Sequence, residues 1–134
     1  ELDNTINISM DANKKEIFLN SDKEQLSRVF FNLVKNSIES IQHRAKNDSS
    51  LDKKITIEVN DESNHIIINI LDNGIGFGIF AKNIKDILNP YFTTKKNGTG
   101  LGLSIVSKIV NDHNGKIEFI PLDDGAKIKI DFNK

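Results

Sequence analysis

The sequence predicts an α+β two-layer sandwich, in which a mixed, mostly antiparallel sheet of about five strands packs on three helices. Strand-like segments stand before, between and after segments with helical periodicity, so both belong to one folding unit. Neighbouring strand-like segments are joined by short turn-forming stretches, which favours antiparallel pairing. The chain has 134 residues and contains no internal repeat or low-complexity tract, so we expect a single domain over residues 1–134.

The first part of the chain predicts a hairpin and a long helix. Residues 5–10 and 16–20 are short β-type runs separated by a turn-prone stretch, which indicates a hairpin. We expect the helix to be capped by Ser21 or Asp22 and to end near Lys46. Its apolar residues recur at spacings of three and four: Leu26, Val29, Phe30, Leu33, Val34, Ile38 and Ile41.

Two strands and a short helix are expected next. Residues 55–59 alternate strictly between apolar and polar, and residues 65–71 form a more apolar run, so we expect two adjacent strands with the second more buried. A short helical segment, 79–88, lies between two glycine-rich stretches.

A helix and a hairpin complete the predicted fold. Helical spacing resumes at Leu103 and ends at residues 114–115, an asparagine and a glycine suited to a helix C-terminus. Residues 116–120 and 127–132 then alternate and are joined by a turn-forming stretch, which predicts the final hairpin.

Composition excludes several classes of function. The 18 basic and 19 acidic side chains give a net charge of -1, so any anion site must be local rather than a broad basic surface for nucleic acid or membranes. The absence of cysteine excludes disulfides and thiol chemistry. No apolar run approaches the roughly 20 residues that cross a bilayer. We therefore expect a cytoplasmic domain, whose parent protein could be anchored in the inner membrane.

Two asparagines on the long helix, Asn32 and Asn36, are candidate ligands. At about 100 degrees per residue they lie one above the other at the edge of the apolar arc, between core and solvent. A carboxamide oxygen is a hard, neutral ligand, and Mg2+ accepts one or two such oxygens while keeping waters and nucleotide phosphates. Two solvated amides would give the same pattern, so the spacing alone leaves both interpretations open.

The stretch DNGIG, residues 72–76, directly follows a buried strand. Asp72 in a partly dry pocket would be a strong acceptor for an amino group such as that of adenine. Guanine presents a carbonyl there, and the unpaired buried group would cost on the order of 1 to 3 kcal/mol, about ten-fold or more in preference. Gly74 and Gly76 let the backbone approach the ring. An Asn-Gly turn that ends a strand is the alternative interpretation.

A second glycine-rich stretch, residues 97–103, opens directly into a helix. Its N–H groups and the positive end of the helix dipole make phosphate oxygens natural ligands, and Lys95 and Lys96 could add positive charge nearby. The preceding residues, 89–96, have two aromatics followed by polar and basic side chains, which is the composition of a lid. A flexible linker and a surface loop pinned by aromatics are the alternatives.

These four stretches occur together and in this order in the catalytic domains of sensor histidine kinases, where they are called the N, G1, F and G2 boxes. The resemblance covers the chain from Asp22 to the final hairpin and rests on QLSRVFFNLVKNSIES, LDNGIGF and NPYFTTKKNGTGLGLSIV, which are most similar to the nitrogen-regulation NtrY/NtrB group. It implies the Bergerat ATP-binding fold of the GHKL superfamily, with the nucleotide between the long helix and the lid.

The resemblance also implies roles for individual residues, with ATP and Mg2+ as the cofactors. Asn36 would ligate the metal, Asn32 would help to hold phosphates or water, and both would serve catalysis. Asp72 would accept the adenine amine, with Gly74 and Gly76 lining the base pocket. Lid and glycine-rich residues would complete the nucleotide site: Phe92, Thr94, Lys95, Lys96, Gly98, Thr99, Gly100, Leu101, Gly102 and Leu103.

The chain departs from the family in two respects. Many members have a basic residue and an aromatic three and four places after the metal-binding asparagine, where this chain has Glu39 and Ser40. The family's phosphoacceptor is a histidine in a separate dimerisation helix, and His43, His65 and His113 lack its sequence context. We therefore expect a monomer that binds ATP but shows little autophosphorylation, without the dimerisation and sensor domains of a homodimeric kinase and acting on a response regulator only indirectly.

Two other functions are compatible with the same motifs. An ATPase related to gyrase, mismatch-repair or heat-shock ATPases would need a glutamate four residues before the metal-binding asparagine, and Asn32 cannot accept a proton there at neutral pH. A non-catalytic nucleotide-sensing or partner-binding module is the other alternative.

Overall fold

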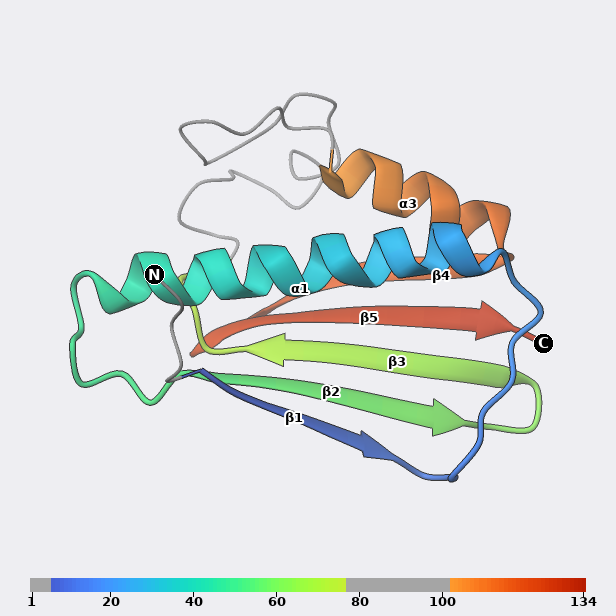
Figure 1. The fold of residues 1–134 in the computed structure, drawn as a ribbon, viewed down its shortest axis with the longest axis horizontal. Coiled ribbons are helices and arrows are strands. Elements are labelled where there is room, and N and C mark those ends of the chain that lie inside the picture. The colour runs from blue at the N-terminus through green and yellow to red at the C-terminus, as the bar shows by residue number, and fades with distance from the viewer. Residues whose placement is uncertain (1–5, 77–101) are drawn as a thin grey trace.

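In the described part of the chain, a five-stranded sheet forms one layer, and two helices, α1 and α3, lie together on one face of it (Figure 1). The computed structural model describes residues 6–76 and 102–134. Within these ranges the elements in chain order are β1 (Asn7–Ala12), α1 (Lys23–Ala45), β2 (Lys54–Asp61), β3 (His65–Asp72), α3 (Gly102–Asp112), β4 (Gly115–Leu122) and β5 (Gly125–Asn133).

The sheet is mixed, as predicted. Its strand order is β1-β2-β3-β5-β4, with β1 parallel to β2 and the other three pairs antiparallel. Because side chains alternate along a strand, Asp72 at the end of β3 points to the same face as Ile70, toward the helices. The central strands β3 and β5 supply most of the strand residues in the core: Ile66, Ile68, Ile70, Ala126, Ile128, Ile130 and Phe132.

Helix α1 lies across the sheet with one side in the core. Val29, Leu33 and Ile41 are completely buried on that side, because positions four apart fall on the same face of a helix. Ser37 occupies the position between Leu33 and Ile41 and is also buried. A hydroxyl group therefore stands where the helical pattern would place an apolar side chain.

The N-terminus of α1 is tied to the C-terminus of α3. The Asp22 carboxylate accepts hydrogen bonds from the N–H groups of Glu24 and Gln25 at 3.0 and 3.2 Å, which confirms Asp22 as the cap. The Asp22 N–H in turn donates to His113 Nε2 at 3.0 Å. His113 Nδ1 lies 2.8 Å from the Ile109 carbonyl oxygen, so the ring proton belongs on Nδ1.

The predicted N-terminal hairpin is wrong. Strand β1 pairs in parallel with β2, so that Met10 lies opposite Ile57, and residues 16–20 form no strand. The Asn13 side chain explains the path, because its amide exchanges hydrogen bonds with the main chain of Asp61, at 2.8 and 3.2 Å. The chain then crosses to α1, as a parallel connection requires.

The remaining described elements agree with the prediction. Strands β2 and β3, helix α3 and the β4–β5 hairpin lie where the sequence pattern placed them, and Asn114 after α3 has a positive φ of 58°. The predicted helix at 79–88 lies outside the described residues. Within the two described ranges, no helix is long and apolar enough to cross a membrane.

Candidate nucleotide-binding site

Asp72 is a buried acceptor at the end of β3. Its side chain points between the sheet and α1, and the residue is only 8% exposed. One carboxylate oxygen accepts a hydrogen bond from the Gly74 N–H at 2.9 Å, and the carboxylate also accepts one from the Ser37 hydroxyl. Burial raises the pKa of Asp72 above its ordinary value of 3.8, while these two hydrogen bonds act in the opposite direction.

The main chain after Asp72 can approach its neighbours closely only because glycines are present. A Cβ atom on Gly74 would collide with Ser40 of α1, and one on Gly125 would collide with the Asp72 carbonyl oxygen. Gly125 also has a φ of +113° and Gly76 a φ of +78°, backbone conformations that residues other than glycine rarely adopt. The stretch of residues 72–76, which corresponds to the G1 box and is called the G1 stretch below, is therefore held tightly between α1 and the β4–β5 turn.

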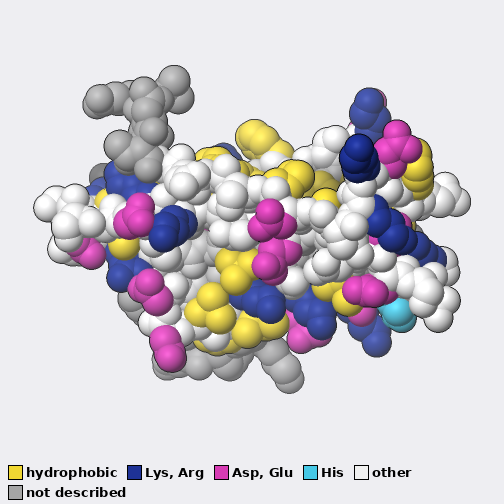
Figure 2. Space-filling view, turned by 90° about the horizontal axis from the view of Figure 1, so that it is seen from below, with side chains coloured by type: hydrophobic (Ala, Val, Ile, Leu, Met, Phe, Trp, Pro, Cys, Tyr) yellow, Lys and Arg dark blue, Asp and Glu magenta, His cyan; other side chains and the backbone are white. Residues whose placement is uncertain are grey.

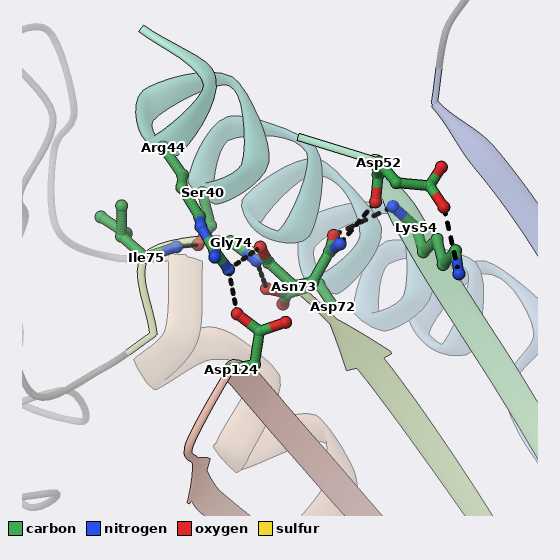
Figure 3. A network of polar contacts seen from close by, with 9 residues as sticks. All are labelled: Ser40, Arg44, Asp52, Lys54, Asp72, Asn73, Gly74, Ile75 and Asp124. Carbon is green, nitrogen blue, oxygen red and sulfur yellow. Dashed lines mark hydrogen bonds and ion pairs between the residues drawn. The ribbon is translucent and has the colours of Figure 1, made fainter. Parts of the chain in front are cut away.

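Two polar side chains of α1 hold the same stretch, and the β4–β5 turn supports one of them (Figure 3). Ser40 Oγ accepts a hydrogen bond from the Ile75 N–H at 3.0 Å. The Arg44 guanidinium donates to the Asn73 carbonyl oxygen at 2.8 Å and forms an ion pair with Asp124 of the β4–β5 turn. These contacts fix the main chain beside the Asp72 carboxylate.

Asn73 connects the stretch to the start of β2. Its side-chain oxygen accepts from the Lys54 N–H at 2.9 Å, and its side-chain nitrogen donates to the Asp52 carbonyl at 2.6 Å (Figure 3). Asn73 therefore serves the loop geometry, which the alternative interpretation as an Asn-Gly strand end would also require. The buried carboxylate of Asp72 is the feature that such a turn alone does not need.

The candidate metal ligands lie on the same helix. Asn32 and Asn36 are half-buried on α1, about one turn apart, and Asn36 directly precedes Ser37. Within the described residues, no group of three or more histidine, cysteine or acidic side chains is arranged to hold a metal. The amide oxygens of Asn32 and Asn36, together with nucleotide phosphates, are a donor set that Mg2+ accepts.

The structure brings together only part of the predicted site. Asp72 and Gly74 lie against α1, and Gly76 lies beside Gly125. Gly102 and Leu103 are half-buried at the start of α3, which packs beside α1. The other predicted nucleotide contacts lie outside the described residues: Phe92, Thr94, Lys95, Lys96, Gly98, Thr99, Gly100 and Leu101.

Sequence reasoning missed the residues that support Asp72, which are Ser37, Arg44 and Asp124, and it noted Ser40 only as a departure from the family. A signal was present for Ser37, because a hydroxyl on the apolar arc of a helix must find a buried partner. Ser40 and Arg44 follow it at spacings of three and four, on one side of α1. Asp124 carried no signal, because its pairing with Arg44 is visible only in three dimensions.

Known proteins resemble this chain in sequence and in structure. Residues 21–134 match the family described as histidine kinase-, DNA gyrase B-, and HSP90-like ATPase. The nitrogen regulation protein NtrY of Azorhizobium caulinodans is 36% identical over 111 residues, which are 81% of this chain and 14% of that protein. Sensor histidine kinase ZraS of Escherichia coli strain K12 is 35% identical over 123 residues, which are 83% of this chain and 24% of that protein. The catalytic domain of histidine kinase ThkA has a TM-score of 0.80 and 28% identity, over 97% of this chain and 80% of that one.

The family match and the two-layer fold define an ATPase domain of the kind that histidine kinases contain. The chain belongs to the histidine kinase-, DNA gyrase B-, and HSP90-like ATPase family, because the match covers most of its length. Its relatives are sensor histidine kinases and include an NtrY protein, as the sequence predicts. The chain spans only 14% and 24% of the length of NtrY and ZraS.

Proposed function

We propose that this domain binds Mg-ATP and donates the γ-phosphate to a histidine on a separate dimerisation domain in two-component signalling. The observation that carries the proposal is the Asp72 carboxylate, which is buried beside α1 and held by Gly74 and Ser37. A buried acceptor of this kind suits the amino group of adenine and disfavours the carbonyl of guanine. The similarity to histidine kinases supports the same assignment.

In this proposal, α1 supplies the metal and phosphate contacts. Asn36 ligates Mg2+ and Asn32 holds phosphates or water. Mg2+ supplies charge neutralisation on the phosphates when bound. The glycines after Asp72 line the base, and Gly98, Gly100, Leu101 and Gly102 wrap the phosphates. The other predicted residues from Phe92 to Leu103 complete the nucleotide site.

The nucleophile comes from another domain. His65 is engaged by Asp131 at 2.8 Å, and His113 bonds to Asp22 and Ile109, so both have structural partners. The partners proposed for the domain are therefore ATP and the dimerisation domain of the same kinase, with a response regulator served indirectly. The cytoplasm is the proposed compartment, and the domain by itself is proposed to be a monomer.

Calorimetric titration with Mg-ATP and Mg-GTP tests the proposal. We expect the protein to bind ATP in preference to GTP. Asp72→Asn should weaken ATP binding by about ten-fold or more, because the amide of the introduced asparagine can present a donor to the adenine amine. Asp131→Asn on β5 is the matched control and should leave ATP binding unchanged. Equal binding of ATP and GTP would contradict the role of Asp72.

A second measurement tests the missing nucleophile. Incubation with labelled Mg-ATP should leave the chain unlabelled, although ATP is bound. Acid-labile phosphohistidine on His43, His65 or His113 would overturn the proposal that the acceptor lies elsewhere.

A further inference from the structure

The two peptide units that follow Asn73 have their polar groups held from opposite sides. The carbonyl of the Asn73–Gly74 peptide accepts from Arg44 at 2.8 Å, while the N–H of the same peptide donates to the Asp72 carboxylate at 2.9 Å. The N–H of the next peptide, at Ile75, donates to Ser40 Oγ at 3.0 Å. The rotation of both peptides is therefore fixed by α1 and by Asp72 itself.

This arrangement joins Arg44 to the carboxylate through one peptide. If the Asn73 carbonyl lost Arg44, the peptide could rotate, and the Gly74 N–H would no longer be aimed at the Asp72 oxygen. A charged donor also polarises the peptide and strengthens the hydrogen bond that its N–H makes. Arg44 therefore influences the orientation of Asp72 without contacting it.

Asp124 holds the guanidinium in place from the opposite side. It lies in the β4–β5 turn and pairs with Arg44, whose side chain is 30% exposed. The next residue of the turn, Gly125, places its carbonyl beside Gly76 at the other end of the stretch. The main chain at Asn73 and Gly74 thus lies between α1 and the turn (Figure 3).

We propose that Arg44, with Ser40 and Asp124, is a positioning residue for purine recognition, which holds the peptide after Asn73 so that Asp72 keeps its adenine-selective orientation. The inference rests on the proposed function, because it takes Asp72 as the contact for the base. It also gives Ser40 a role, because its hydroxyl accepts from the Ile75 N–H. A small hydroxyl there leaves room for Gly74 to lie against α1.

The test compares nucleotide selectivity among variants. We expect Arg44→Ala to weaken Mg-ATP binding by about two- to ten-fold, the value of one hydrogen bond, with a smaller change for Mg-GTP. Lys14→Ala is the matched control, because Lys14 also ties two elements through an ion pair, with Asp61 at 3.3 Å, but does not contact residues 72–76. It should leave both nucleotides unchanged. An equal loss for ATP and GTP, or unchanged ATP binding, in Arg44→Ala would overturn the inference.

A double-mutant cycle shows whether Asp124 acts through Arg44. Asp124→Ala lies in an exposed turn and should fold normally, with an ATP affinity reduced by about two-fold. In the Arg44→Ala background the same substitution should have no further effect. Additive losses would contradict the pairing.

A measurement without nucleotide separates this inference from the proposed function. In the nucleotide-free protein, amide hydrogen exchange at Gly74 and Ile75 should be faster in Arg44→Ala than in the parent chain. Unchanged exchange would overturn the inference even if ATP binds. Faster exchange in a protein that never binds ATP would overturn the proposed function while leaving the positioning of the main chain intact.

Discussion

The two ends of α1 meet the sheet in different ways. At the C-terminal end, Ser37, Ser40 and Arg44 make polar contacts with the strand end of β3 and the stretch after it. Toward the N-terminal end, Leu26 and Phe30 face an open apolar hollow of about 320 Å³ between helix and sheet. One helix therefore provides a tightly specified polar contact and a loosely filled apolar one.

Loose packing near the N-terminal end of α1 extends to the edge strand β1. Ile8 and Met10 of β1 are 51% and 67% exposed, although they lie on the same face of the sheet as the buried Ile55. Figure 2 shows the protein from the lower side of Figure 1, and hydrophobic side chains lie at this surface among charged ones. We therefore expect substitutions at the apolar end of α1 to disturb the protein less than substitutions at the polar end.

Truncation of one core residue at each end of α1 should show the difference in packing most clearly. Ile41→Ala removes a completely buried side chain at the polar end and should lower the free energy of unfolding by about 3 to 4 kcal/mol. Leu26→Ala removes a partly buried side chain that lines the hollow and should cost about 1 kcal/mol. Urea unfolding measures both, and equal losses would show that the two ends are packed alike.

The glycines give a second, smaller effect. Gly125→Ala forces a side chain into a φ of +113° and toward the Asp72 carbonyl, so we expect a loss of roughly 2 to 3 kcal/mol. A Cβ on Gly102 at the start of α3 meets no atom of the described residues within 4 Å, so Gly102→Ala should be neutral or stabilising by up to about 1 kcal/mol. Similar losses from both substitutions, measured by urea unfolding, would contradict the tight enclosure of the G1 stretch.

Periodicity was sufficient to predict most of the fold. The three-and-four spacing defined α1 and α3. Alternation defined β2, β4 and β5, and a continuous apolar run defined β3, each within a residue or two. The hairpin at residues 5–20 failed because alternation shows that a segment is extended but not which strand it pairs with. The partner of β1 is β2, more than forty residues later, and the contact of Asn13 with Asp61 has no local signature.

The site was predictable where chemistry is carried by a motif. Asp72 follows a buried strand and precedes glycines, and the structure places its carboxylate in a buried position beside α1. Arg44 and Asp124 were not predictable, because their positions relative to Asn73 depend on how a helix end and a hairpin turn meet. The nucleotide roles of Asn32 and Asn36 stay predictions.

The smallest expected effect is the pH dependence of stability that Asp72 causes at the polar end of α1. Burial raises the pKa of Asp72, so its contribution to stability is complete below the ordinary pKa of 3.8 and is lost as the pH rises through the higher pKa of the folded protein. Asp72→Asn, which cannot ionise, should therefore gain stability relative to the parent chain with rising pH, while losing ATP affinity. Asp61 is the opposite case, because hydrogen bonding to Lys134 lowers its pKa, and Asp61→Asn should lose stability at neutral pH and recover as the pH falls. Urea unfolding between pH 3 and pH 7, roughly the span of carboxyl titration, measures both variants. If Asp72→Asn were less stable than the parent chain at neutral pH, the ionised carboxylate would be a net stabilising group. Its burial would then carry no free-energy cost for nucleotide binding to explain.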